Sequence, residues 1–407
     1  MSFELHGKCA FRKLDLIPQF VVLAGIRRLV LGAIHSLIVK NDGSVWSTIT
    51  SVRSDSKMFV QVIPSGATTA AAAPGGAFSI VLKEDGSVWG KGVNNFGQLG
   101  DGTQTRRDTF IRVTTIPGAK AVALGGSHSI ILTTKGQVLM SGLNKSGQHG
   151  NSMLRGYTMR FIIVISEGVE AVAAGLEHSI VLKNDGSVWA TGRNQHGQLG
   201  DGSKDNNHVF MRIISDGAAG IAAGEHHSIA LKRDGSVWAT GWNKYGQLGD
   251  GSTADRIIYQ LVISSGAKAV AAGSRHSMML GQDGSVWATG YNLYGQLGDG
   301  STVNSKLFEQ VISDGAKSVV AGGFHSIMLK QDGGIWATGS NKEGQYGDGA
   351  TKFETNFVAL APLDNGAAHD ATCTHISLPF DHQNALTSRL WGHEGAISHH
   401  YGWNRDD

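Results

Sequence analysis

The 407-residue sequence has little cysteine, little proline and no long hydrophobic run, and each shortage excludes a class of protein. Its two cysteines, Cys9 and Cys373, are too few for the bridge framework of small secreted proteins and favour a reducing compartment. With 6 prolines beside 57 glycines, the chain is neither collagen-like nor a proline-rich linker, and the glycines indicate many tight turns. An uninterrupted apolar run of about 18 residues, as a membrane helix needs, is also missing.

The chain also lacks a strong charge of either sign. Its net charge is +2, with +4 on residues 1–60 and −2 on the remainder. A near-neutral body disfavours a nucleic-acid surface, because that binding depends on neutralising phosphates. The N-terminus carries Glu4 before its first lysine and interrupts its apolar run with Pro18 and Gln19, which is unlike a signal peptide. We therefore expect a soluble monomer of the cytoplasm or nucleus, with no membrane or nucleic-acid partner.

What the sequence does contain is a repeat. The segment GSVWATGWNKYGQLGDGST begins at Gly235, and close copies begin at Gly186 and Gly284. The aligned Val-Trp positions lie 43, 50, 50, 49, 49 and 49 residues apart, at Trp46, Trp89, Leu139, Trp189, Trp238, Trp287 and Trp336. Seven units of this length are typical of a β-propeller, in which each unit supplies about one four-stranded blade.

One unit shows why each repeat is expected to form four strands. Its short apolar or alternating runs are IYQLVI (258–263), AKAVAAG (267–273), HSMML (276–280) and SVWATG (285–290). Asp-Gly, the strongest short hairpin signal, joins the last two runs in this unit and recurs in most others. The alanine-rich run suits the crowded centre of a propeller, and the tryptophan suits the space between blades. We therefore predict an all-β, seven-bladed propeller of four-stranded antiparallel blades.

The repeat also predicts the domain boundaries. We expect an N-terminal extension over residues 1–19, the propeller over 20–362 and a non-repeat tail over 363–407. The runs FVVLAG (20–25) and FVALAP (357–362) make eight outer-strand copies for seven units, so we expect the ring to be closed by terminal strands, with one copy completing the last blade. The first unit is shortened, because it omits the GQLGDG segment.

No motif indicates catalysis, a cofactor or a metal. GQLGDG recurs in unit after unit without a GxxxxGK[ST] sequence, so it predicts a turn, with Asn243 and Gln247 bonding loop backbone, and not a phosphate loop. HExxH and GxSxG are absent. A GxxHS histidine recurs once per blade and is expected to be structural, because metal ligands must converge on one point. These histidines are His35, His128, His178, His227, His276 and His325, with Phe78 in the second unit.

The pattern VxAGxxHSxxLxxDGSVWATGxNxxGQLGDG resembles the repeat of the regulator of chromosome condensation family, over about residues 20–360. The resemblance implies a seven-bladed propeller but leaves function open, because members include nucleotide-exchange factors, photoreceptors, enzyme inhibitors and scaffolds. The GWRHT tryptophans of the plant ultraviolet receptor are replaced here by Leu176, Glu225 and Ser274. Regular 49- or 50-residue intervals leave no room for the hairpin wedge that exchange factors project from a blade.

The variable loops indicate where a partner would bind. The GxxHS turns and the segments after GQLGDG should share one face and differ between units, and repeat proteins bind through such surfaces. The residues expected to bind a partner are Arg106, Arg107, Arg155, Tyr157, Lys204, Arg275 and Phe324. The hypothesis is a non-enzymatic protein-interaction module. The alternatives are neutral variation of these loops, exchange activity on a small GTPase, and an effector-type inhibitor of a partner enzyme.

Overall fold

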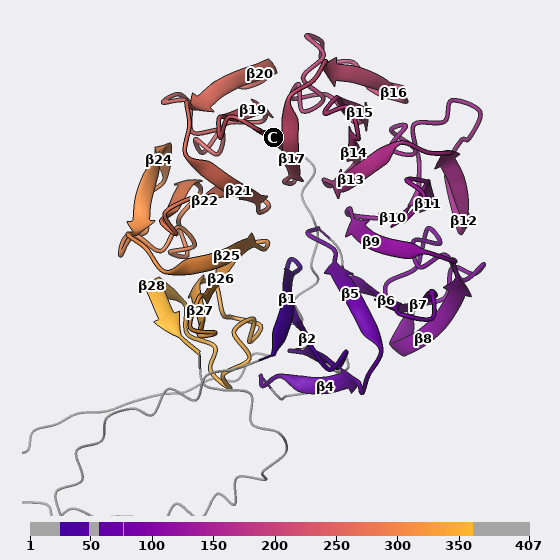
Figure 1. Ribbon diagram of the computed structural model, residues 1–407, viewed down its shortest axis with the longest axis horizontal. Helices are drawn as coiled ribbons and strands as arrows, with labels where there is room; N and C mark the ends of the chain where they lie inside the picture. Colours follow the sequence, from indigo (N-terminus) through magenta and orange to yellow (C-terminus); the bar gives the residue numbers. More distant parts are fainter. Residues whose placement is uncertain (1–24, 49–56, 76, 361–407) are drawn as a thin grey trace, which may run out of the picture. The chain divides into compact units, whose positions relative to one another are not determined.

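A computed structural model describes residues 25–48, 57–75 and 77–360. In these ranges the chain forms strands β1 to β28, grouped in seven four-stranded sheets that surround a common centre as the blades of a propeller (Figure 1). No helix of this described part is long and apolar enough to span a membrane. The predicted fold, all-β with seven antiparallel blades, is therefore confirmed.

Each blade is built from four strands that follow one another in the sequence. The strands of blades 1 to 4 are β1 (Ile26–Leu31), β2 (Ser36–Lys40), β3 (Val45–Ser47), β4 (Val60–Ile63), β5 (Ala67–Ala72), β6 (Phe78–Lys83), β7 (Ser87–Gly92), β8 (Arg107–Thr115), β9 (Ala119–Leu124), β10 (His128–Thr133), β11 (Val138–Leu143), β12 (Tyr157–Ile165), β13 (Val169–Ala174), β14 (His178–Lys183), β15 (Val188–Gly192) and β16 (Asn207–Ile214). Those of blades 5 to 7 are β17 (Ala218–Ala223), β18 (His227–Lys232), β19 (Val237–Gly241), β20 (Arg256–Ile263), β21 (Ala267–Ala272), β22 (His276–Gly281), β23 (Val286–Gly290), β24 (Ser305–Ile312), β25 (Ala316–Ala321), β26 (His325–Lys330), β27 (Ile335–Gly339) and β28 (Glu354–Ala359).

The first strand of every blade is the innermost one, as the alanine-rich runs predict. In Figure 1 β5, β9, β13, β17, β21 and β25 converge on the centre, and neighbouring innermost strands contact one another, as β13 contacts β9 and β17. The second strand of each blade is buried almost along its whole length, as in β22. The tryptophan of the third strand packs on the preceding blade: Trp287 lies against the cluster that contains Ile229 and Val237. The core is therefore divided among the interfaces between blades.

Antiparallel pairing in chain order separates the connections into two faces. The turns between second and third strands and the crossovers to the next blade lie on one face, which we call the hairpin face. The connections between first and second strands and between third and fourth strands lie on the other, which we call the loop face. In the hairpin of blade 6, Gly284 has φ +85° and the Asp283 carboxylate accepts a 2.9 Å hydrogen bond from the Ser285 amide, which confirms the predicted Asp-Gly turn.

The repeated glycine loop holds neighbouring blades together. Gly197, in the GQLGDG loop of blade 4, accepts a 3.0 Å hydrogen bond at its carbonyl from the Thr240 hydroxyl of blade 5. Asp201 of the same loop forms a β-bridge with Ile258 on the outer strand of blade 5. A Cβ at Gly200 would lie 2.7 Å from the Tyr259 ring, so only glycine lets the loop approach this closely.

The last blade contacts the first by the same devices. The amide of Gly349, in the glycine loop of blade 7, donates to the carbonyl of Lys57 at 3.2 Å, and the amide of Gly323 donates to Gly32 at 3.0 Å. The outer strand of blade 7 is β28, which contains the start of the FVALAP run. Closure by terminal strands is not shown, because every sheet contains four consecutive strands.

Several predictions from the sequence fall on residues that the structure does not describe. The N-terminal extension (1–19), nearly all of the FVVLAG run and the tail (363–407) lie outside the described residues. The same holds for residues 49–56 of the shortened first repeat. The proposed boundaries of the propeller at 20 and 362 remain predictions, and the described blades extend from Ile26 to Ala359.

Candidate interaction surface

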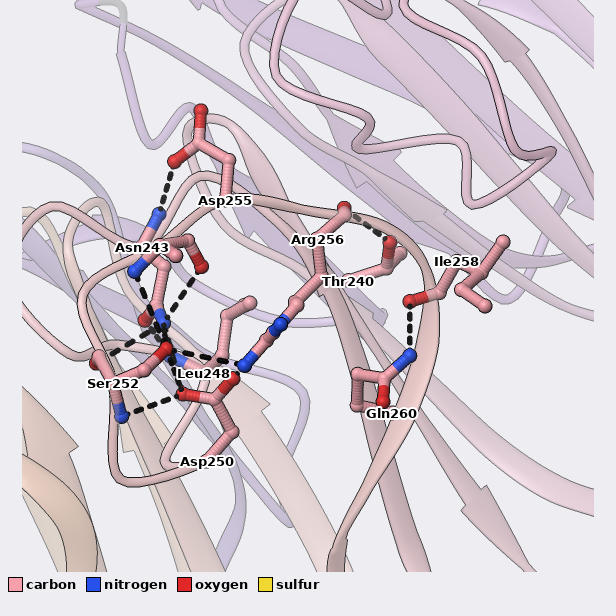
Figure 2. A network of polar contacts seen from close by, with 10 residues as sticks. Thr240, Asn243, Leu248, Asp250, Ser252, Asp255, Arg256, Ile258 and Gln260 are labelled. Carbon is pink, nitrogen blue, oxygen red and sulfur yellow. Dashed lines mark hydrogen bonds and ion pairs between the residues drawn. The ribbon is translucent and has the colours of Figure 1, made fainter.

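Each long loop of the loop face is organised around a buried asparagine. In blade 5 the Asn243 amide nitrogen donates to a carboxylate oxygen of Asp250 (3.0 Å) and to the carbonyls of Ser252 and Ala254 (both 3.1 Å) (Figure 2). Its side-chain oxygen accepts a 3.0 Å bond from the Leu248 amide. The side chain is completely buried, so these bonds replace the water it has lost. The loop carries its own internal acceptors and donors, as expected for an architectural turn.

An arginine closes the same loop in two blades. The Arg256 guanidinium lies 2.6 Å from a carboxylate oxygen of Asp250, whose side chain is only 6% exposed. The equivalent pair in blade 2, Arg107 and Asp101, is 2.5 Å apart, with Asp101 5% exposed. A charge-assisted bond to a buried carboxylate is stronger than an exposed ion pair. Arg107 therefore has a structural role in its loop.

The repeated histidines form hydrogen bonds from blade to blade. In six junctions the histidine Nε2 lies 2.7–3.1 Å from a serine hydroxyl of the next blade, and His227 with Ser277, at 3.0 Å, is one example. The Ser277 hydroxyl donates its proton to the Gln247 carbonyl at 2.6 Å. The imidazole must therefore donate its Nε2 proton to that hydroxyl, which leaves Nδ1 as the unprotonated nitrogen. The predicted structural role of these histidines agrees with this geometry.

Burial keeps these histidines neutral. It lowers the pKa of His35, His178 and His276 to about 4, with a nearby lysine charge adding to the effect at His35. For His227 and His325 burial and neighbouring histidines lower the pKa to about 3. Within the described ranges, no group of three or more histidine, cysteine, aspartate or glutamate side chains is placed to hold a metal ion.

Next to this uniform ring, the variable positions of blades 4 to 7 bring aromatic side chains together. We call this set the aromatic arc; it consists of His196, His226, Trp242, Tyr245, Tyr291, Tyr294 and Phe324. Successive ring centroids are 4.7–6.3 Å apart, in tilted or edge-to-face arrangements that aromatic pairs favour. The rings come from inner turns and long loops of four blades, so the arc is continuous across blade boundaries.

Arg275 lies among these rings and carries the positive charge of the arc. Its guanidinium carbon is 5.4 Å from the Trp242 centroid and 5.9 Å from that of Phe324. Its Nε lies 3.4 Å from a carboxylate oxygen of Glu225, and 30% of the side chain is exposed. The aromatic rings thus hold the Arg275–Glu225 ion pair in place, and the pair remains accessible to solvent.

The two ends of the arc differ in charge and polarity. At the blade 4 end, burial, together with the neighbouring His196 and Arg193, lowers the pKa of His226 to about 2, so His226 is neutral at physiological pH. At the other end, partial burial and the neighbouring Tyr294 raise the pKa of Tyr291, and Tyr294 is 38% exposed. The arc therefore presents apolar faces with hydroxyl, imidazole and guanidinium groups at their edges.

At the positions of Trp242 and Arg275, blades 2 and 3 carry smaller or aliphatic side chains, although Phe96 of blade 2 stands at the position of Tyr245. Val93 and Leu143 stand where Trp242 stands in blade 5, and Ser127 stands where Arg275 stands in blade 6. The buried asparagine is kept, since Asn94 makes the same bonds in blade 2 as Asn243 makes in blade 5. The loop framework is thus common to these blades, and the aromatic arc is confined to blades 4 to 7.

The residues predicted to bind a partner divide into two groups. Arg275 and Phe324 lie together in the arc. The other five lie in the long loops of blades 2 to 4 or at the first residue of the strand that follows; they are Arg106, Arg107, Arg155, Tyr157 and Lys204. Of these, Arg107 bonds Asp101, as described above. Arg106 pairs with Asp108 at 2.9 Å, and both side chains are well exposed.

The sequence analysis missed most of the arc because its residues lie inside a motif that looks uniform. Trp242 and Tyr245 occupy two of the x positions of GxNxxGQ, flanking the asparagine that shapes the loop. Tyr291 and Tyr294 occupy the same positions one blade later. A comparison of these x positions alone between units reveals the aromatic residues. A comparison of whole loops selects the segments after GQLGDG instead, because their sequences differ most.

Comparisons with known proteins agree with this architecture. Two models of the regulator of chromosome condensation (RCC1) repeat match the chain, one at 119–148, 169–198, 218–247, 267–296 and 316–345, the other at 85–132, 185–231, 234–280 and 283–329. No curated protein matches the sequence.

Solved structures resemble the chain in fold. Human WBSCR16 is 22% identical, with a TM-score of 0.67, over 75% of this chain and 84% of its own. Prp20p of Saccharomyces cerevisiae, whose binding to Gsp1p and histones has been described, is 21% identical, with a TM-score of 0.66, over 79% of this chain and 84% of its own. The repeat models together cover more than half of the sequence, and the chain belongs to the RCC1 repeat family.

Proposed function

We propose that this propeller is a non-enzymatic protein-interaction module whose partner docks on the aromatic arc of blades 4 to 7. The observation that supports this proposal is the placement of Arg275 between Trp242 and Phe324 on a rigid loop face. Tryptophan, tyrosine and arginine are the residues that most often dominate the energy of protein interfaces. The arc supplies all three types within one continuous surface.

The geometry also limits the entropy lost on binding. The loops that carry Trp242 and Tyr291 are fixed by buried asparagines, and the rings contact one another before any partner arrives. A surface that is ordered in the free protein loses little side-chain freedom when it is covered. The family relationship is consistent with such a role, because Prp20 has been crystallised with Kap60 bound.

Affinity capture from the native cell extract, with two matched double variants, tests this proposal. The arc variant Trp242→Ala/Arg275→Ala should lose the partner that the unaltered protein captures. The control variant Arg106→Ala/Lys204→Ala removes two cations from the other candidate loops and should retain it. A partner lost only by the control variant would move the site to the loops of blades 2 to 4 and contradict the proposal.

Exchange activity on a small GTPase is the alternative function. Within the described part of the chain, the long loops of blades 4 to 6 have nearly equal lengths, with 14 residues between β15 and β16 and also between β19 and β20 and between β23 and β24, so none carries a projecting hairpin wedge. Release of labelled nucleotide from a captured GTPase separates the two functions. An interaction module leaves the release rate unchanged, whereas an exchange factor increases it by orders of magnitude.

A further inference from the structure

On the hairpin face, five blades place a lysine over the tryptophan of the next strand. The lysine ends the second strand, and its ammonium nitrogen lies 4.1–4.9 Å from the centre of the indole. The pairs are Lys40 with Trp46, Lys83 with Trp89, Lys183 with Trp189, Lys232 with Trp238 and Lys330 with Trp336. At this distance the cation is attracted to the ring face. Each of these blades thus fills a cation site with its own side chain.

Blade 6 keeps the tryptophan and lacks the lysine. Gly281 pairs with Ala267 in the register in which Lys232 pairs with Ala218 in blade 5, so Gly281 occupies the lysine position. A cavity of about 400 Å³ opens there, lined by Trp287, Met279, Ile263, Gly281 and Asp283 among others. The missing side chain has therefore left space beside the indole.

Two polar atoms lie where a lysine side chain at position 281 would begin. A Cβ built on Gly281 would lie 2.4 Å from a carboxylate oxygen of Asp283 and 2.4 Å from the Ser285 hydroxyl. In the lysine-bearing blades a real Cβ occupies this point, so the equivalent oxygens must stay farther away. In blade 6 these two oxygens line the vacated position directly. The cavity thus has an aromatic face on one side and a carboxylate on another.

The charge of this carboxylate is also less compensated than in other blades. In blade 5, hydrogen bonds from Ser236 lower the pKa of Asp234, and the nearby positive charge of Lys232 lowers it further. In blade 6, hydrogen bonds from Ser285 lower the pKa of Asp283, without a contribution from any cation. Asp283 is therefore ionised. Its negative charge has no lysine nearby among the described residues, whereas that of Asp234 lies close to the positive charge of Lys232.

We propose that the Trp287 cavity binds a lysine side chain of a partner protein, with its ammonium over the indole and beside the Asp283 carboxylate. The occupant is inferred from the chain itself, because a lysine fills the same position in five other blades. The site lies on the hairpin face, so it is independent of the aromatic arc and of any partner bound there.

Blade 3 provides a natural comparison for the chemistry of the site. There Thr133 replaces the lysine and Leu139 the tryptophan, and a cavity of about 670 Å³ is again present. Lys135, Arg160 and Phe161 line that cavity and none of its lining residues is acidic, so a cation meets two like charges there and no indole or carboxylate. A cavity alone is therefore not the requirement; the proposal depends on the indole and the carboxylate.

The test is a titration of the full chain with a blocked Gly-Lys-Gly tripeptide. Binding is monitored through the ¹⁵N–¹H NMR signals of the tryptophan indoles. We expect the Trp287 signal to move saturably, with a dissociation constant on the order of 10 mM, as for a single cation–π contact. The matched tripeptide with norleucine, which lacks only the ammonium, should leave the signal in place. Free putrescine binding more tightly than the lysine tripeptide would overturn the assignment to a protein lysine.

Three variants make the test specific. Trp287→Leu, which copies Leu139 of blade 3, removes the indole signal, so binding to it is followed at the backbone amide signals of Gly281 and Gly284 and should be abolished. Asp283→Asn, at an exposed position, should weaken binding about threefold without disturbing the fold. Lys232→Gly should create a second site, so that the Trp238 signal also moves. Binding that survives Trp287→Leu, or a Lys232→Gly protein that still has one site, would contradict the proposal.

Discussion

Two consecutive residues in the inner turn of blade 5, His226 and His227, lie in different environments. His227 is completely buried and bonds the Ser277 hydroxyl of blade 6. His226 keeps 14% of its side chain exposed, and its ring lies 5.3 Å from that of His196 and 5.9 Å from that of Trp242. The first residue belongs to a set repeated around the ring, and the second belongs to the aromatic arc. Neighbouring residues of one turn thus belong either to the contacts between blades or to the aromatic arc.

This comparison explains how the fold can tolerate sequence change at its surface. The buried layer contains the histidine–serine bonds, the loop asparagines and the glycines that let each loop approach the next blade. The exposed layer contains side chains whose contacts are mainly with one another. Substitutions in the first layer should alter stability, and substitutions in the second should alter binding. The predictions below test that division, from the largest expected effect to the smallest.

Acidification should give the largest effect, because it acts on the whole histidine ring at once. The pKa of each ring histidine is lower in the folded protein than its usual 6.5, so the unfolded chain binds more protons as the pH falls below 6.5. Because the unfolded chain is protonated first, each histidine should lower the free energy of unfolding by about 1 kcal/mol between pH 6.5 and 5.5. The six together should lower it by about 6 kcal/mol. His149 and His226 act in the same direction, since burial also lowers their pKa values.

Denaturant unfolding midpoints measured from pH 7 to pH 5 check this prediction. The variant His227→Phe copies the natural Phe78 of blade 2 and should reduce the pH-dependent loss by about 1 kcal/mol over the same interval. A stability that is constant across this range would show that the histidines are charged or exposed in the folded protein.

Removal of one loop asparagine should have the next largest effect. Asn243→Ala deletes five side-chain hydrogen bonds and leaves the buried Leu248 amide without its partner, at a cost of about 3 kcal/mol in the free energy of unfolding. The neighbouring exposed Lys244→Ala should change it by less than about 0.5 kcal/mol. Thermal unfolding of the two variants provides the comparison, and equal losses would mean that the loop does not depend on its asparagine.

The exposed layer should show the opposite result. Trp242→Ala should weaken binding of the captured partner by about 30-fold, as expected for removal of a central aromatic anchor, and should leave the buried loop bonds intact. Val93→Ala, the equivalent position in blade 2, should leave the affinity unchanged. Titration of the purified partner by calorimetry measures both values. An affinity that depends equally on Val93 would extend the binding surface around the whole ring.

The fold could be predicted from the sequence because its signals are local and repeated. Asp-Gly between two alternating runs, as at Asp283-Gly284, specifies a hairpin, and this arrangement recurs at nearly constant spacing. The aromatic arc could not be predicted in this way, since Trp242 and Tyr291 are 49 residues apart and meet through Tyr245 only when blades 5 and 6 pack. The Trp287 cavity depends on one absent lysine. The repeat shows Gly281 at the lysine position, but only the structure shows that this lysine lies over the indole in other blades.

The smallest predicted difference concerns two consecutive arginines, Arg106 and Arg107, both expected from the sequence to bind a partner. The Arg107 guanidinium makes two bonds, of 2.9 and 2.5 Å, to one carboxylate oxygen of Asp101, which is nearly buried. Arg107→Ala should therefore lower the free energy of unfolding by about 1.5 kcal/mol. Arg106 pairs with Asp108 in solvent, so Arg106→Ala should change it by less than about 0.5 kcal/mol. Thermal unfolding at low and high salt distinguishes them, because salt screens only the exposed pair. Equal losses would place Arg107 in the exposed layer and return it to the candidate binding surface.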